Sequence, residues 1–338
     1  MRIALTRILG GVVLLLIGIL VGILLAGWVA TDRSLEPEQS SPAPVIRPVV
    51  PSPVSPPPPP APDPSPPAVE EPSPPEWQPG DGSTMVSLSV GYEHSCGLWD
   101  DGTVSCWGDE AFVQIPVPEA RLFLDLAAGD YHACGITADG ATRCWGFLEG
   151  MPMANPTSRF VMLRAEAKQQ CGLTARGAVS CWGVEPRSHR TVGGPFVTFD
   201  VGLQGHVCGI KDDGALICDG GAPLPFTPPN GTFTQVSVGQ EFACAVTEDG
   251  SISCFGRAPS GMPTGSDFVQ VSVGASNACA IREDGSVRCW GSGPISAPSG
   301  VTMQGLAVGS NHACGIRTDG QPFCWGANSR GQSRPPTR

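Results

Sequence analysis

Short stretches of alternating apolar and polar residues recur along residues 81–338. The clearest are V-S-L-S-V at 86–90 and V-S-V at 236–238 and 271–273. Alternation with a period of two predicts strands that bury one face. In five copies a glycine follows, five residues before a cysteine, at Gly91, Gly129, Gly239, Gly274 and Gly309. We therefore expect each repeating unit to begin with a strand and a glycine bend.

The segment after each bend has the pattern of a β-hairpin. Its first copy, residues 96–108, reads C-G-L-W-D-D-G-T-V-S-C-W-G. Asp-Gly at the centre suits a three-residue loop in which the glycine takes a positive φ. With residues 100–102 as the loop, Cys96 faces Cys106 in a non-hydrogen-bonded pair, where the Cα atoms approach to about 4.5 Å. A disulfide accepts roughly 4.4–6.8 Å, so the register predicts a bridge within the hairpin.

Seven copies of this hairpin follow one another at intervals of 35 to 38 residues between first cysteines, which indicates a repeat architecture. Six copies have Asp-Gly at the turn, and the third has Arg176-Gly177. The cysteine pairs use all 14 cysteines of the chain. The predicted disulfides are Cys96–Cys106, Cys134–Cys144, Cys171–Cys181, Cys208–Cys218, Cys244–Cys254, Cys279–Cys289 and Cys314–Cys324.

A closed ring is the architecture that this repeat favours. Each unit offers three to four short strands, and seven such units fit an all-β, seven-bladed β-propeller. An open solenoid needs polar capping repeats, whereas the first and last units are as regular as the middle ones. A large ring follows the second cysteine in most units, where we expect it to pack between blades; a ring of ligand-binding aromatics is the alternative. Residues 84–90 either begin the first blade or complete the last.

The N-terminal 30 residues predict a membrane anchor. Residues 8–30 carry no charge and are long enough to span a bilayer. Arg2 and Arg7 favour a cytoplasmic N-terminus. We therefore assign residues 1–30 to one transmembrane helix that acts as an uncleaved signal anchor. A cleaved signal peptide is the alternative.

Composition changes sharply after the anchor. Residues 31–80 are rich in proline, and such a segment should be an extended, disordered linker that holds residues 81–338 away from the membrane. The net charge of −11, without a Lys/Arg cluster, argues against nucleic-acid binding. Fourteen evenly spaced cysteines indicate an oxidising compartment. Together these features predict a single-pass membrane protein whose propeller is periplasmic or extracellular.

The repeat resembles that of the regulator of chromosome condensation superfamily. The motif G-x-x-H-x-C-G-I-x-x-D-G occurs whole at residues 129–140 and 309–320. The segment W-G-A-N-S-R-G-Q at 325–332 is similar to the family's W-G-x-N-x-x-G-Q. The resemblance covers residues 81–338 and implies a seven-bladed β-propeller. The short period also resembles a bacterial branch that includes a secreted β-lactamase inhibitor protein.

Units three and four depart from the family pattern. Glu166 occupies a glycine position, unit four has an extra residue before Cys208, and Asp219 replaces the tryptophan. The family's best-known activity is nucleotide exchange on the small GTPase Ran, together with chromatin binding. The predicted topology, disulfides and acidity oppose that activity, and a fold does not carry a function with it.

Four histidines precede a first cysteine by two residues: His94, His132, His206 and His312. We interpret them as repeat-encoded side chains that bond to backbone, not as a metal ring. Zinc needs four ligands, whereas one hairpin supplies two cysteines, so disulfides are the preferred interpretation. The sequence contains no recognisable catalytic motif. We accordingly predict no metal, no cofactor and no catalytic residues.

Specific binding should come from the linkers between hairpins, because these segments vary while the hairpins do not. The linkers at 109–122 and 147–159 are the most apolar. They supply the candidate partner-binding residues Phe112, Phe147, Leu148, Met151 and Met153. The predicted function is a membrane-anchored, extracytoplasmic binding module for a protein or glycan of the cell envelope, without enzymatic activity. The alternatives are an inhibitor of an extracytoplasmic enzyme and, third, a guanine-nucleotide exchange factor.

Overall fold

The computed structural model of the chain describes residues 81–110, 116–118, 122–147, 158–183, 190–202, 205–220 and 227–338. These residues fall within one compact unit, Pro72–Arg338. The predicted transmembrane helix and the Pro-rich linker lie outside the described residues. Within the described ranges, no helix is long and apolar enough to cross a bilayer.

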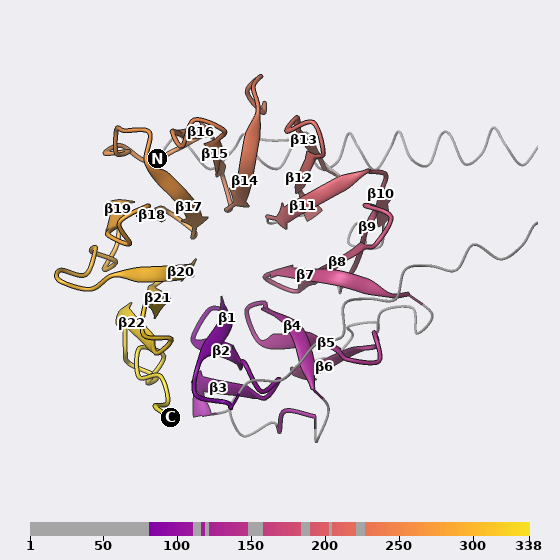
Figure 1. Cartoon of the computed structure of the whole chain (residues 1–338), viewed down its shortest axis with the longest axis vertical. Helices are drawn as coiled ribbons and strands as arrows, with labels where there is room; N and C mark the ends of the chain where they lie inside the picture. Colours follow the sequence, from indigo (N-terminus) through magenta and orange to yellow (C-terminus); the bar gives the residue numbers. More distant parts are fainter. Residues whose placement is uncertain are drawn as a thin grey trace, which may run out of the picture. The chain divides into compact units, whose positions relative to one another are not determined.

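Seven antiparallel sheets surround a central channel as the blades of a propeller, as predicted (Figure 1). The strands nearest the channel are β1 (Met85–Val90), β4 (Phe123–Ala128), β7 (Phe160–Glu166), β11 (Phe196–Val201), β14 (Phe233–Val238), β17 (Phe268–Val273) and β20 (Met303–Val308). The middle strands are β2 (His94–Trp99), β5 (His132–Thr137), β8 (Gln169–Thr174), β12 (Val207–Lys211), β15 (Phe242–Thr247), β18 (Asn277–Arg282) and β21 (His312–Arg317). The outer strands are β3 (Val104–Gly108), β6 (Thr142–Gly146), β9 (Val179–Gly183), β13 (Leu216–Asp219), β16 (Ile252–Gly256), β19 (Val287–Gly291) and β22 (Pro322–Gly326). A fourth strand, β10 (Arg190–Val192), extends the third blade beyond β9.

The hairpin register agrees with the sequence prediction. Cys96 pairs with Cys106, and Gly102 in the turn has a φ of 78°, which a residue with a Cβ rarely adopts. All seven predicted disulfides are present, with Cα–Cα distances of 4.0–4.1 Å. Each blade is thus bridged across its own middle and outer strands.

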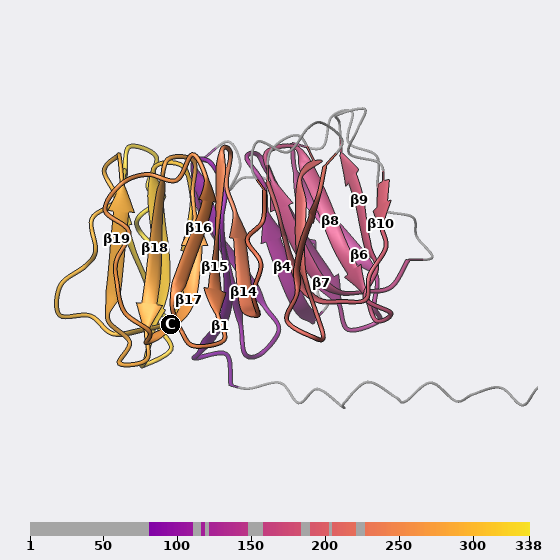
Figure 2. The same cartoon turned by 90° about the horizontal axis from the view of Figure 1, so that it is seen from above.

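The strands run between two faces of the propeller (Figure 2). The turn face carries the hairpin turns, and each turn there meets the start of the next blade's inner strand; for example, Phe123 N donates to Gly102 O at 2.9 Å. The bend face carries the glycine bends. A Cβ on Gly239 would lie 2.5 Å from Gly274 O of the next blade, so this close approach requires glycine.

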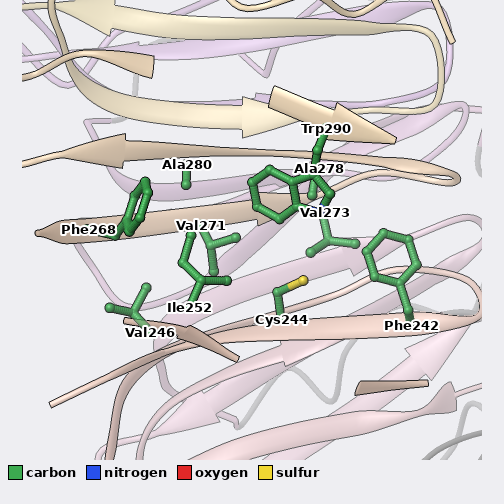
Figure 3. Packing of buried hydrophobic residues seen from close by; sticks show 10 residues of the cluster. All are labelled: Phe242, Cys244, Val246, Ile252, Phe268, Val271, Val273, Ala278, Ala280 and Trp290. Carbon is green, nitrogen blue, oxygen red and sulfur yellow. The ribbon is translucent and has the colours of Figure 1, made fainter. Parts of the chain in front are cut away.

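The hydrophobic core is divided into seven clusters, one between each pair of neighbouring blades. Figure 3 shows the cluster that joins Cys244 of blade five to Phe268 and Trp290 of blade six. Trp145 belongs to the same kind of cluster with Cys96 of the preceding blade. The rings that follow the second cysteines therefore pack between blades, as predicted.

The ring closes between blades seven and one without a shared strand. β1 pairs with β2, so this segment begins the first blade. Met85 N donates to Gly320 O at 2.9 Å, and Trp107 Nε1 donates to Gln332 O at 3.0 Å. The C-terminal tail thus holds the first blade against the last.

Candidate binding surface

Two tyrosines from neighbouring blades lie side by side on the bend face. Tyr92 follows the glycine bend of blade one, and Tyr131 lies in the bend of blade two. Their ring centroids are 6.1 Å apart, and the rings are 37% and 43% exposed. The chain has only two tyrosines, and both are in this pair. Tyrosine is enriched at binding interfaces because it combines an apolar ring with a polar tip.

Phe147 adjoins the tyrosine pair. It follows β6 directly, its backbone N–H donates to Tyr131 O at 2.8 Å, and its side chain is 56% exposed. We call Tyr92, Tyr131 and Phe147 the aromatic patch. Of the predicted contact residues, Phe147 is the one within the described ranges. The other four lie outside them: Phe112, Leu148, Met151 and Met153.

Sequence reasoning missed both tyrosines because they belong to the bends, which it treated as scaffold. A usable signal was present: tyrosine occurs nowhere else in the chain.

Acidic groups surround the aromatic patch. Slight burial, and then the charges of Asp130, Glu93 and Asp109, raise the pKa of Tyr131. Burial also raises the pKa of Asp130, an effect that the charge of Lys168 opposes. Arg330 Nε lies 3.6 Å from Glu93 Oε2. The patch therefore offers exposed aromatic faces in a negative environment, which can stack on sugars, apolar side chains or cations.

The central channel has a volume of about 380 Å³ and is lined by the inner strands. Many of its polar side chains join one blade to the next. Ser89 Oγ accepts from Ala128 N at 2.8 Å, and Gln235 bonds to both backbone groups of Val271 at 2.9 Å. These groups hold the ring together, so the channel wall serves structure more than binding.

Glu166 differs from the other channel residues because it occupies a bend position that is glycine in the regular blades. Burial raises its pKa to about 8, and the charges of Asp130 and Asp200 add to this effect. Asp200 itself accepts from Val238 N at 2.8 Å and lies 4.0 Å from Arg164 Nε. Blade three thus introduces a carboxyl group that is largely protonated at neutral pH.

The four repeat-encoded histidines are buried. Burial lowers the pKa of His94 to about 3 and those of His132 and His312 to about 4. His132 Nε2 lies 3.2 Å from Gln170 Oε1, and His312 Nε2 lies 2.8 Å from Ser95 Oγ. In these two blades the partner is a side chain of the next blade instead of the expected backbone group, because the histidine points across the gap between blades.

Metal and cofactor sites were not predicted. Among the residues that the structure describes, no group of three or more His, Cys, Asp or Glu residues is arranged to hold a metal ion.

The geometry defines a class of protein: a seven-bladed β-propeller with one disulfide in each blade. The profile of the Regulator of chromosome condensation (RCC1) repeat matches residues 85–112, 123–147, 233–261, 268–294 and 304–332. The chain belongs to this repeat superfamily. The units without a match are the third and fourth, where the sequence departs from the pattern.

Several solved structures share the fold. The CRINKLY WD40 ectodomain of the Arabidopsis thaliana receptor kinase ACR4 is 24% identical with a TM-score of 0.64, and the alignment covers 73% of this chain and 97% of that one. The ectodomain of the Physcomitrella patens receptor kinase CR4 is also 24% identical with a TM-score of 0.64, covering 72% and 73%. Prp20p of Saccharomyces cerevisiae is 14% identical with a TM-score of 0.54, covering 67% and 80%. No curated protein matches the chain in sequence.

Proposed function

We propose that the chain is a membrane-anchored, extracytoplasmic propeller that binds a protein or glycan of the cell envelope through the aromatic patch, without catalysis of its own. The observation that carries this proposal is the gathering of both tyrosines of the chain beside Phe147 on one face. Aromatic side chains have only two rotatable torsions, so they lose little conformational entropy on binding.

The disulfides support the proposed compartment. Every cysteine is bridged, one pair in each blade, and such bridges persist in oxidising environments. Two of the similar structures are ectodomains of receptor kinases, so propellers of this shape do occur on the outer side of cell membranes. Prp20p is described as binding Gsp1p and histones, which is a parallel for protein recognition by the fold.

A photo-crosslinking experiment tests the binding role. The full-length chain would carry a photoreactive phenylalanine at Phe147 or, as the control, at Ile217, which is exposed on the outer strand of blade four. We expect one specific envelope partner from position 147, lost in Tyr131→Ala, and no such product from position 217. Equal products from both positions would contradict the proposal.

Two further measurements test the proposed compartment and the proposed absence of catalysis. Thiol alkylation of intact cells should find no reactive cysteine before reduction, whereas free thiols would place the propeller in a reducing compartment. Purified chain should give no turnover on envelope polysaccharides or peptides. If the crosslinked partner is an enzyme that the chain inhibits, the function is inhibition.

A further inference from the structure

The turn face carries a second surface, independent of the aromatic patch. The second residue of each inner strand lies there, and the pairing with the middle strand skips it in every blade, for example between Met85 and Ser87. This is the position of a β-bulge, which re-aims a side chain away from the regular sheet. We call these seven residues the collar: Val86, Leu124, Val161, Val197, Thr234, Val269 and Gln304.

Five collar residues are aliphatic, and their exposed fractions lie between 42% and 59%. The preference of aliphatic residues for strands does not explain their presence here, because a bulged residue does not pair with the neighbouring strand. Polar side chains also fit this position, as Thr234 and Gln304 show. Of the seven, Val86 and Gln304 line the central channel. The inner strands start toward the periphery and end at the channel in Figure 1, so the collar, at the strand starts, forms a wide circle around this opening. Equivalent apolar side chains exposed around one opening are typical of an interaction surface.

Acidic turns flank the collar. The seven three-residue hairpin turns contain ten acidic side chains and one basic side chain, Arg176. Six of the acids fall on three successive turns, in blades four to six: Asp212, Asp213, Glu248, Asp249, Glu283 and Asp284. These turns touch the strands that carry the collar, since Phe233 N donates to Gly214 O and Phe268 N to Gly250 O, both at 2.9 Å.

Three nearby arginines have acidic partners of their own, while Lys211 and Arg288 belong to the same blades as the acidic turns and offset part of their charge. Arg317 pairs with Asp319 at 2.7 Å, Arg338 pairs with Asp101 at 3.2 Å, and Arg282 pairs with Asp267. The turns of blades four to six therefore keep a negative charge beside an apolar opening. Charge of this kind attracts a positively charged partner and repels anionic surfaces.

We propose that the turn face docks a positively charged polypeptide segment that carries apolar side chains. The apolar side chains pack on the collar, and Lys or Arg residues on either side reach the acidic turns of blades four to six. This surface is separate from the aromatic patch, and it stands whether or not the proposed function is correct.

Fluorescence anisotropy with three labelled peptides tests the chemistry of the partner. The probe K-R-L-W-G-L-W-R-K combines positive charge with apolar residues, E-D-L-W-G-L-W-D-E reverses the charge, and K-R-S-Q-G-S-Q-R-K removes the apolar residues. We expect the purified full-length chain to bind the first at least tenfold more tightly than the others, with an affinity that falls as salt rises. Equal binding of the acidic peptide would overturn the proposal.

Variants locate the site and separate it from misfolding. Val161→Thr and Val197→Thr keep the side-chain shape, and each should weaken binding about threefold, whereas Thr234→Val should strengthen it about threefold. Glu248→Gln should weaken binding about twofold, while Glu241→Gln, on the bend face of the same blade, should not. Equal effects of the two glutamate variants, or collar-dependent binding to phosphatidylglycerol vesicles, would overturn the proposal.

Discussion

The interface between blades five and six and the interface between blades three and four meet the same packing requirement differently. In the first, Trp290 of blade six belongs to one cluster with Cys244 of blade five (Figure 3). In the second, the residue at the tryptophan position is Asp219. There β10 adds a fourth strand to blade three, and its Val192 joins the cluster around Cys181.

Polar contacts differ in the same way. Ser237 and Gln235 connect blades five and six through neutral hydrogen bonds to backbone groups. Blades three and four are joined by charged groups instead: Arg164 with Asp200, and Arg190 with Asp219. At each interface, neighbouring apolar groups thus pack over the disulfide, and we call these groups its cover. The cover is one aromatic ring in the first interface and an added strand anchored by charged groups in the second.

Removing the aromatic cover should have the largest effect. Trp290 is 6% exposed, so Trp290→Ala should leave a cavity and lower the free energy of unfolding by about 3–5 kcal/mol. Guanidinium unfolding of the full-length chain under non-reducing conditions measures the loss.

Trp290→Phe is the matched control, because Phe255 fills the equivalent position in blade five and packs in the cluster around Cys208. We expect this variant to keep most of the stability. If Trp290→Ala and Trp290→Phe unfold alike, the ring does not serve as a cover.

Much of this comparison could be predicted from the sequence, and part of it could not. The cysteine spacing and the Asp-Gly turns determine the register of each hairpin, so all seven bridges follow from local geometry. The position of Trp290 in the repeat predicted inter-blade packing. The cover supplied by Arg190 and Val192 was not predictable, because a three-residue strand has no periodicity of its own. The aromatic patch was not predicted for a similar reason: its residues come from two blades, which only the closed ring brings together.

The half-buried carboxyl of Glu166 in blade three should give a smaller effect that depends on pH. The pKa of Glu166 rises from its ordinary value of 4.5 to about 8, so the folded chain keeps a proton that the unfolded chain releases between these values. Stability should therefore fall as pH rises through this window. Glu166→Gln removes the penalty and should stabilise the chain at pH 8 by about 1–2 kcal/mol, less than the full shift implies because the Glu166 residue is only partly buried.

Unfolding curves for Glu166→Gln and the original chain at pH 4.5 and pH 8 would check this expectation. The two proteins should match at the lower pH and separate at the higher one. Glu241→Gln, an exposed change in blade five, should show no such separation. A constant difference at both values would mean that packing, not titration, explains the effect.

The smallest expected effect concerns the charged anchor of the added strand. Arg190 Nη2 donates to Asp219 O at 2.8 Å, and Arg190 Nη1 lies 3.6 Å from Asp219 Oδ1. Arg190→Ala removes both contacts and should cost about 1 kcal/mol, because the pair is partly exposed. Asp219→Asn keeps the backbone carbonyl acceptor and should cost less.

Hydrogen exchange sharpens the test. Protection at Val192 should fall in Arg190→Ala while protection at the blade five–six interface stays unchanged, because each blade contacts only its neighbours. A uniform loss across the ring would show that β10 stabilises the whole propeller and not one local gap.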